Sequence, residues 1–292
     1  MDFETVEDFK DYVVIKNIKN FELDHVFECG QCFRWNKTET GSFIGVAFGR
    51  VIEVEKQNND LIIYNTNKEE FNNIWFEYFD LNRDYTKIKE ELSKDELLKK
   101  SVDFGKGIRI LKQEHFELLI SFIISSNNRI PMIKRAIATI SEKWGEKIKY
   151  KDKVYYSFPT IEKLYDKTIE DFEKCSTGFR AKYIANTCEN VYKNNGILEH
   201  IFSLNDDECH TELQKFTGVG PKVADCIMLF SMQKYSAFPV DVWVKRAMMH
   251  FYVAPDVSLK KIREFGRDKF GNLSGFAQQY LFYYARENNI EV

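Results

Sequence analysis

The stretch FTGVGPKVADC, which runs from Phe216 to Cys226, places two glycines and a proline between two segments of helical spacing. Glycine tolerates positive φ, so Gly218 and Gly220 suit a sharp turn. Pro221 suits the first position of the helix that follows, where its missing N–H group costs nothing. The pattern predicts a helix, a tight hairpin and a second helix over residues 206–232.

Backbone N–H groups exposed at such a turn, next to a helix N-terminus, attract phosphate. Gly218, Val219 and Gly220 are therefore candidate phosphate contacts. A nucleotide-binding Walker loop needs the order G-x-x-x-x-G-K-[ST]. This hairpin has a different glycine spacing, and no Ser or Thr follows its lysine. Binding of a nucleoside triphosphate is disfavoured, and a helical corner without a ligand stays open as an alternative.

The composition is that of a globular protein: the chain has 292 residues, 44% hydrophobic and 15% aromatic residues, and a net charge of −3. This length predicts about two domains. The acidic start does not resemble a signal peptide, and the longest aliphatic run, at 118–124, is too short to span a bilayer. We expect an intracellular monomer with no membrane attachment. The enrichment in Lys, Ile and Asn suggests the cytoplasm or nucleoid of a prokaryote.

The periodicity changes along the chain and predicts an α+β protein. Alternating segments in the first part predict one antiparallel sheet with strands at 11–16, 31–35, 42–49, 50–56 and 60–66. Helical spacing later in the chain predicts helices near 114–125, 129–143, 179–194, 206–216, 221–232, 241–252, 257–269 and 274–287. We expect a strand-rich domain at 1–105 and a helical domain at 106–292.

Charge gives a weaker signal. Residues 129–153 hold eight Lys or Arg against three acidic residues, which suits a solvated face or a contact with nucleic acid.

Lys222 lies in the first turn of a predicted helix, where the macrodipole disfavours a cation. That position, with partial burial, predicts a lowered pKa for Lys222, as a nucleophilic lysine requires. An ordinary surface lysine remains the alternative.

Asp241 follows Pro239 and Val240 and precedes an apolar helical run, so it is a candidate N-cap. A GVGPK hairpin followed about twenty residues later by PVD resembles the helix-hairpin-helix DNA glycosylase superfamily. In that superfamily the lysine and the aspartate face one active site. The resemblance narrows to the 8-oxoguanine DNA glycosylase/AP lyases through ECGQCFRW (28–35), GIRILKQEHFELLISFIISSNN (107–128), GFRAKYI (178–184) and FAQQYLF (276–282).

The resemblance implies a TBP-like antiparallel sheet domain followed by a helical glycosylase core that acts on duplex DNA. The target base is extruded from the helix because its glycosidic bond cannot be reached inside the stack. In the family, the lysine matched by Lys222 attacks the sugar and forms a Schiff base. β-Elimination then cuts the strand, and the aspartate matched by Asp241 stabilises positive charge on the sugar.

The resemblance also implies a pocket for the lesion. The backbone carbonyl of Gly30 reads the proton that 8-oxoguanine carries on N7. Gln278 faces the pairing edge of the base, and Phe282 and Cys226 enclose its ring. Each of these residues also has an ordinary structural interpretation, as a turn, a helix surface or a core position.

For the opposite strand the matched residues are Asn127, Phe179 and Arg180, which fill the gap and contact the orphaned cytosine. Two positions depart from many eukaryotic relatives: Met132 stands in place of an arginine, and Trp243 in place of a histidine that contacts phosphate. These departures affect the expected preference for cytosine and the expected grip on phosphate.

No cofactor or metal is expected. Cys29 and Cys32 have C-x-x-C spacing but no second pair nearby, so packing within the sheet is the preferred interpretation. Some superfamily members bind an iron–sulfur cluster through four cysteines after the aspartate, whereas no cysteine follows Cys226 here. All six cysteines are expected to be reduced thiols. A non-catalytic DNA-binding module is the alternative function, and covalent attachment of Lys222 to substrate separates the two.

Overall fold

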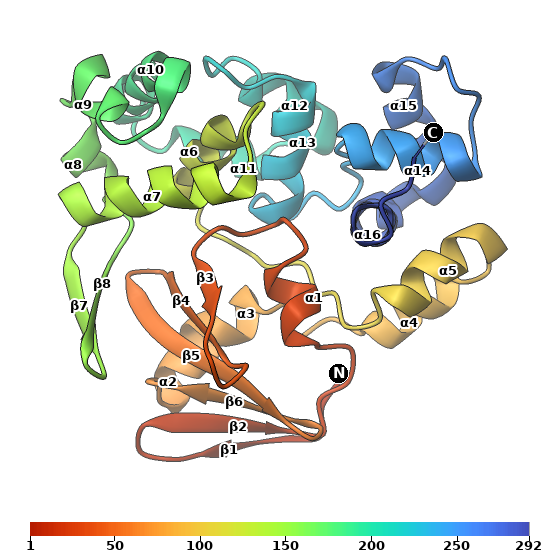
Figure 1. Cartoon of the computed structure of the whole chain (residues 1–292), viewed down its shortest axis with the longest axis horizontal. Coiled ribbons are helices and arrows are strands. Elements are labelled where there is room, and N and C mark those ends of the chain that lie inside the picture. Colours follow the sequence, from red (N-terminus) through yellow and green to blue (C-terminus); the bar gives the residue numbers. More distant parts are fainter. Residues whose placement is uncertain (292) are drawn as a thin grey trace.

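The computed structural model describes residues 1–291, whose N-terminal part forms one six-stranded antiparallel sheet in the order β1-β2-β6-β5-β4-β3 (Figure 1). The strands are β1 (Thr5–Asp8), β2 (Tyr12–Lys16), β3 (Trp35–Lys37), β4 (Phe43–Ala47), β5 (Arg50–Gln57) and β6 (Asp60–Tyr64). The central strands are rich in Val and Ile, which suit a pleated, buried surface. The antiparallel sheet that the sequence predicts is confirmed.

One face of the sheet packs against a short helical run made of α2 (Lys68–Glu70), the π-helical turn η1 (Phe71–Trp75) and α3 (Phe76–Tyr78). This core is strongly aromatic. The Trp35 ring stacks on Phe27 at 4.1 Å, and its indole N–H donates to the Tyr78 hydroxyl at 2.8 Å. Burial of such rings, with their polar atoms satisfied, stabilises the N-terminal layer.

The predicted strand at 31–35 is wrong, since only its last residue, Trp35, belongs to a strand. The buried Gln31 side chain explains the difference. Its amide N–H groups donate to the carbonyls of Val26 and Arg109 at 2.8 and 2.7 Å, and its oxygen accepts from Leu111 N. These bonds hold residues 28–34 as an irregular loop between the sheet and the helices.

The remainder is helical apart from one hairpin, β7 (Lys147–Tyr150) paired with β8 (Lys153–Tyr156). The helices before this hairpin are α1 (Leu23–Phe27), α4 (Tyr85–Leu92), α5 (Glu96–Phe104), α6 (His115–Ser125) and α7 (Ile130–Trp144). Those after it are α8 (Ile161–Leu164), α9 (Ile169–Glu173), η2 (Gly178–Arg180), α10 (Ala181–Lys193), α11 (Ile197–Ser203), α12 (Asp206–Leu213), α13 (Pro221–Phe230), α14 (Val242–Phe251), α15 (Leu259–Phe270), η3 (Gly271–Leu273) and α16 (Ser274–Glu287).

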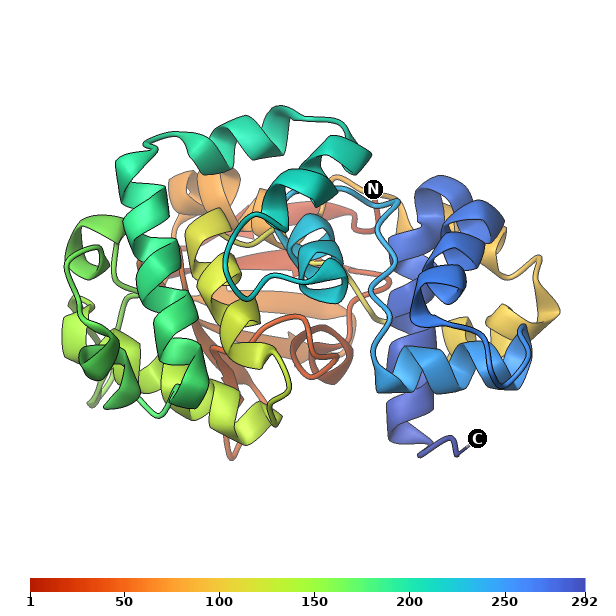
Figure 2. The same ribbon diagram turned by 90° about the horizontal axis from the view of Figure 1, so that it is seen from above.

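The helices fall into two groups in the view from above. Figure 2 shows α6–α13 on one side, and α14–α16 with α4 and α5 on the other. The eight predicted helices are present, and the expected α+β class is confirmed. Among residues 1–291, no helix combines the length and the apolar character that crossing a membrane requires.

The sequence did not predict α4 and α5, and these helices pack with the helical core rather than with the sheet. Tyr85, Leu98 and Val102 share a buried cluster with Phe276 and Tyr280 of α16. The proposed domain boundary at residue 105 stays a prediction. The hydrophobic core of the helical part also includes buried side chains before that residue, among them Cys29, Phe33 and Tyr85.

Candidate active site

The hairpin between α12 and α13 has the geometry that its glycines predict. Gly218 has φ +88°, and a Cβ there would stand 2.6 Å from the Tyr183 ring, so neither the backbone angle nor the space admits a side chain. Pro221 occupies the first turn of α13, and the buried Val219 side chain anchors the turn between the two glycines. The helix-hairpin-helix unit is therefore confirmed.

A buried ion pair joins α13 to α15 and holds α13 in place. Arg263 of α15 donates two hydrogen bonds to Asp225, at 2.6 and 2.8 Å. His210 of α12 lies 3.6 Å from the same carboxylate, and burial lowers the pKa of this imidazole. Paired, bidentate geometry satisfies a buried carboxylate that would otherwise be very costly. These contacts hold α12, α13 and α15 together around the hairpin. The sequence did not predict this arrangement.

Lys222 and Asp241 line the same cavity, which has a volume of about 240 Å³. Lys222 extends from the first turn of α13, and its Nζ lies 5.6 Å from the centre of the Phe122 ring. Asp241 is the N-cap of α14 and accepts a hydrogen bond from Val244 N at 2.8 Å, as predicted. Helices from both groups thus bring an amine and a carboxylate to one cavity.

The predicted direction of the Lys222 pKa shift is wrong for the free protein. Burial opposes the charge on the ammonium, but the Cys226 sulfur and the Asp241 carboxylate outweigh this cost, so the pKa of Lys222 lies above its ordinary value. Burial also raises the pKa of the Cys226 thiol to about 11, against the opposing effect of Lys222. Burial raises the pKa of Asp241 as well, against the opposing effects of Val244 N–H and Lys222. The resemblance placed Asp241 at the same site as Lys222, and Cys226 lies one helical turn after Lys222, but their effect on the pKa of the amine was not predicted.

The four predicted lesion-pocket residues, Gly30, Cys226, Gln278 and Phe282, also line this cavity. Gln278 is only 4% exposed, and its Oε1 atom is buried without a hydrogen-bond partner among residues 1–291. A buried unpaired amide oxygen costs free energy unless something binds it. The cavity therefore contains an acceptor that is ready for a hydrogen-bond donor of a ligand.

The residues predicted to contact the opposite strand lie outside the cavity lining. Phe179 and Met132 are 59% and 41% exposed. Arg180 is buried instead, and its guanidinium donates to the carbonyls of Ser126 and Asn127 at 2.8 and 2.7 Å. This contact supports the left-handed backbone of Asn127, which has φ +49°. In this state Arg180 shapes the loop that carries Asn127.

Sequence reasoning missed other residues of the cavity wall, namely Gln279, Arg286, Ser125, Asn128 and Phe122. Trp243, noted above only as a departure, also lies in this wall, and its ring is 4.9 Å from the Arg246 guanidinium. The interpretation of Cys29 and Cys32 needs correction. Cys29 packs in the helical core and only Cys32 in the sheet core, because the loop between them crosses from one layer to the other.

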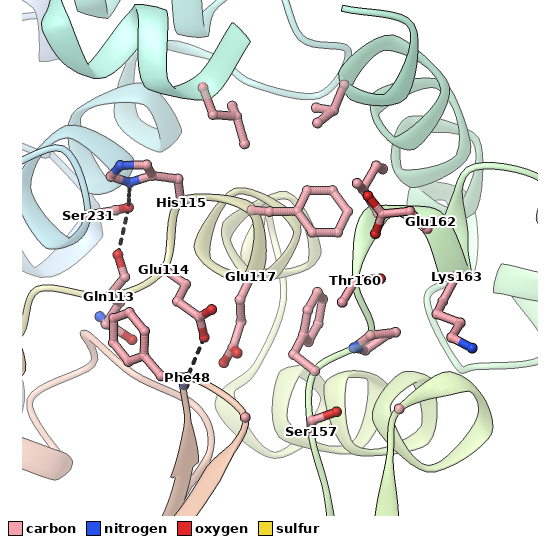
Figure 3. A pocket seen from close by; sticks show the side chains of 18 of the residues that line it. Phe48, Gln113, Glu114, His115, Glu117, Ser157, Thr160, Glu162, Lys163 and Ser231 are labelled. Atoms are coloured by element: carbon pink, nitrogen blue, oxygen red, sulfur yellow. Dashed lines mark hydrogen bonds between the residues drawn. The ribbon is translucent and has the colours of Figure 1, made fainter. Parts of the chain in front are cut away.

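Figure 3 shows a larger cavity, of about 1260 Å³, at the N-terminal end of α6. Glu114 accepts from Phe48 N at 2.8 Å there, and burial raises the pKa of Glu117 to about 7 although Arg34 lies 3.4 Å away. Residues at the other end of α6 line the smaller cavity. Neither Lys222 nor Asp241 borders the larger space, so we assign the site by its chemistry rather than by its size.

Two family models together match most of the chain. The 8-oxoguanine DNA glycosylase N-terminal domain matches residues 13–119, and the HhH-GPD superfamily of base excision DNA repair proteins matches residues 120–273. The chain belongs to the helix-hairpin-helix base excision repair superfamily and, within it, to the 8-oxoguanine DNA glycosylase family. It is a DNA N-glycosylase with lyase activity.

Named relatives agree with this assignment. A probable N-glycosylase/DNA lyase of Methanothermobacter thermautotrophicus is 30% identical over 73% of this chain and 72% of its own length. An N-glycosylase/DNA lyase of Saccharomyces cerevisiae is 30% identical over 89% of this chain and 82% of its own. The crystal structure of the Clostridium acetobutylicum 8-oxoguanine glycosylase/lyase, bound to double-stranded DNA with cytosine opposite 8-oxoguanine, is 67% identical. It matches with a TM-score of 0.98 over 99% of this chain and 100% of that one.

Proposed function

We propose that this protein removes 8-oxoguanine from duplex DNA by Schiff-base chemistry through Lys222 and then cuts the strand by β-elimination. The observation that carries the proposal is the convergence of Lys222, Asp241 and the unpaired Gln278 Oε1 on one cavity. A nucleophile, a carboxylate and a base-reading group are the three functions that a bifunctional glycosylase needs together.

In the free protein the Lys222 amine is protonated and must lose a proton before it can react. Entry of a flipped nucleotide removes the remaining water from the ammonium, and this desolvation favours the neutral amine. Its nitrogen then bonds to C1′ of the deoxyribose. The bond from C1′ to the base breaks, and its electron pair leaves with the base, which takes up the proton that the ammonium released.

Positive charge develops on the sugar as that bond breaks. The Asp241 carboxylate, held rigidly by Val244 N, provides electrostatic stabilisation without having to reorganise. The C1′–O4′ bond then breaks as a proton passes from the nitrogen to O4′, and this ring opening gives the protonated Schiff base between C1′ and Lys222. Loss of a proton from C2′ to water then expels the 3′ phosphate as the C3′–O bond breaks, and the strand is cut 3′ to the lesion.

The base itself is recognised by hydrogen bonds that guanine cannot match. 8-Oxoguanine carries a proton on N7, where guanine has a lone pair, and the Gly30 carbonyl is the acceptor we assign to that proton. Gln278 takes the pairing edge, with Phe282 and Cys226 on the two faces of the ring. Sites built on such hydrogen bonds reject the wrong ligand strongly, because a buried group is then left unpaired. That no iron–sulfur cluster takes part stays a prediction.

The proposal is tested by single-turnover assays on a duplex with 8-oxoguanine opposite cytosine, following base release and strand cutting separately. The native protein is expected to perform both, and Lys222→Gln to perform neither while still binding the lesion duplex. Base release by Lys222→Gln at the native rate would overturn the assignment. Binding of the duplex without base release or strand cutting by the native protein would also overturn the proposal.

A further inference from the structure

The loop that contains Gly30 has an uneven pattern of hydrogen bonds along its backbone. Three of the four carbonyls at residues 28–31 accept a hydrogen bond from a side chain, and the Gly30 carbonyl accepts none from residues 1–291. The three pairs are Arg286 Nη2 with Glu28 O, Gln279 Nε2 with Cys29 O at 2.6 Å, and Gln113 Nε2 with Gln31 O at 2.8 Å. The acceptor left unpaired belongs to the one residue of this segment assigned to reading the base.

Two of these donors extend from α16, the helix that also carries Gln278 and Phe282. Gln279 is 1% exposed, so its amide has no water to bond instead. The Arg286 guanidinium lies 5.2 Å from the centre of the Phe282 ring. A Cβ on Gly30 would stand 3.0 Å from that same ring and 3.6 Å from an Arg286 nitrogen. The stacking ring and the loop backbone are therefore fixed against each other by one helix.

We propose that Gln279 and Arg286 are positioning residues that hold the Gly30 carbonyl in the orientation at which it distinguishes 8-oxoguanine from guanine. The inference rests on the proposed function. A peptide carbonyl can rotate away from a repulsive ligand atom when the neighbouring peptide groups are not held by hydrogen bonds. With the carbonyls of residues 28 and 29 bonded to α16, the Gly30 carbonyl cannot turn from the N7 lone pair of guanine, and the repulsion is retained.

The most direct test measures how much the hydrogen bond between the Gly30 carbonyl and N7–H contributes to the affinity for the lesion. Binding is measured in the Lys222→Gln background, so that no chemistry intervenes. Three duplexes are compared, carrying 8-oxoguanine, guanine, or 8-oxo-7-deazaguanine, which has C–H in place of N7–H. The affinity ratio of the first to the third duplex isolates the N7 hydrogen bond. Because each ratio is taken on one folded variant, a general loss of stability cancels.

Gln279→Leu and Arg286→Met, each added to that background, are expected to lower the ratio by about tenfold, as small misplacements of a reading group do. Arg286→Lys keeps a donor within reach of Glu28 O and should retain most of the ratio. Arg83→Met is the matched control, since Arg83 stacks on Tyr235, bonds Asp80 and donates no hydrogen bond to residues 28–31. It should leave the ratio unchanged.

The outcomes separate the two claims. If both α16 variants keep the full ratio, the positioning role is wrong while the proposed function stands. If Lys222→Gln alone binds all three duplexes equally, the reading of N7 by Gly30 fails, and the positioning role with it. Gln279 is fully buried, so its variant could fold poorly. Arg286 is partly exposed, so the comparison of Arg286→Met with Arg286→Lys still tests the positioning role.

Discussion

The Asp241 carboxylate accepts a hydrogen bond from Val244 N at 2.8 Å and at the same time borders the cavity that contains Lys222. One side chain thus begins helix α14 and borders the cavity at which we propose that the reaction takes place. The capping role alone would contribute about 1 kcal/mol to the free energy of unfolding. The second role predicts effects on catalysis that a cap does not have.

Asp241→Asn separates these roles, because the amide oxygen can still accept from Val244 N while the charge is lost. We expect base release to slow by a factor on the order of 10² or more, as when a preorganised electrostatic group is removed. The melting temperature should change little. Single-turnover rates and thermal unfolding measure the two quantities. A parallel fall in both would mean that Asp241 serves only as a cap.

Met132→Arg tests the preference for the opposite base. Met132 is 41% exposed and its thioether is only a weak acceptor, so it cannot supply the paired donors that an arginine offers to cytosine. We expect the native protein to excise 8-oxoguanine opposite cytosine with modest preference over adenine. The arginine should sharpen that preference by about 5- to 150-fold, the range of 1 to 3 kcal/mol for bidentate base readout.

The control for this prediction is Met132→Leu, which changes shape little and adds no donor. Its rates with the four opposite bases should match those of the native protein. Strict dependence on cytosine in the native protein would contradict the prediction. It would mean that Asn127 and Arg180 are sufficient to select cytosine without an arginine at position 132.

Gly218→Ala probes the hairpin. The methyl group would meet the Tyr183 ring and would also require positive φ, so we expect a loss of about 1 to 3 kcal/mol in the free energy of unfolding. Affinity for duplex DNA should fall with it. Gly220→Ala is the comparison, since within residues 1–291 the added carbon meets no atom within 4 Å beyond its chain neighbours, and φ is negative there. Denaturant unfolding of both variants decides; equal losses would show that the strain at residue 218 is not the cause.

Much of this arrangement could be predicted from residues that are close in the sequence. The hairpin follows from Gly218 and Pro221, the cap from Asp241, and the helices from their spacing. What could not be predicted depends on residues far apart in the chain. Gln31 contacts Arg109 and displaces a predicted strand, and Arg263 reaches Asp225.

The pKa of Lys222 shows the same limit. A position in the first turn of a helix lowers the pKa of a lysine, and local reasoning ends there. The Cys226 sulfur, one turn further along α13, and the Asp241 carboxylate, which comes from another helix, together raise the pKa above its ordinary value. The clamp on residues 28 and 29 likewise joins positions some 250 residues apart. No spacing within a single element contains such information.

Glu117 gives a prediction on pH and stability. Its pKa is about 7 in the folded protein because of burial, against an ordinary value of 4.5, so the folded state holds the proton more tightly. Its contribution to stability is therefore present below about pH 4.5 and is lost as the pH rises to 7. Glu117→Gln does not titrate.

The stability of Glu117→Gln relative to the native protein should rise between pH 4.5 and 7 by roughly 1 to 3 kcal/mol and then level off. The ion pair with Arg34 forms only with the ionised carboxyl, and its effect is already included in the pKa of Glu117. Denaturant midpoints across this range provide the measurement, with the exposed Glu39→Gln as control. A flat difference would mean that the Glu117 carboxyl is ionised throughout.

Borohydride trapping tests the central claim, that the Lys222 amine forms a covalent bond with the sugar. The native protein is incubated with a duplex carrying 8-oxoguanine opposite cytosine, reduced, digested, and mapped by mass spectrometry. The account predicts one cross-linked peptide, with the deoxyribose on Lys222, and no cross-link in Lys222→Gln. A cross-link at another amine, or undiminished trapping in Lys222→Gln, would contradict it.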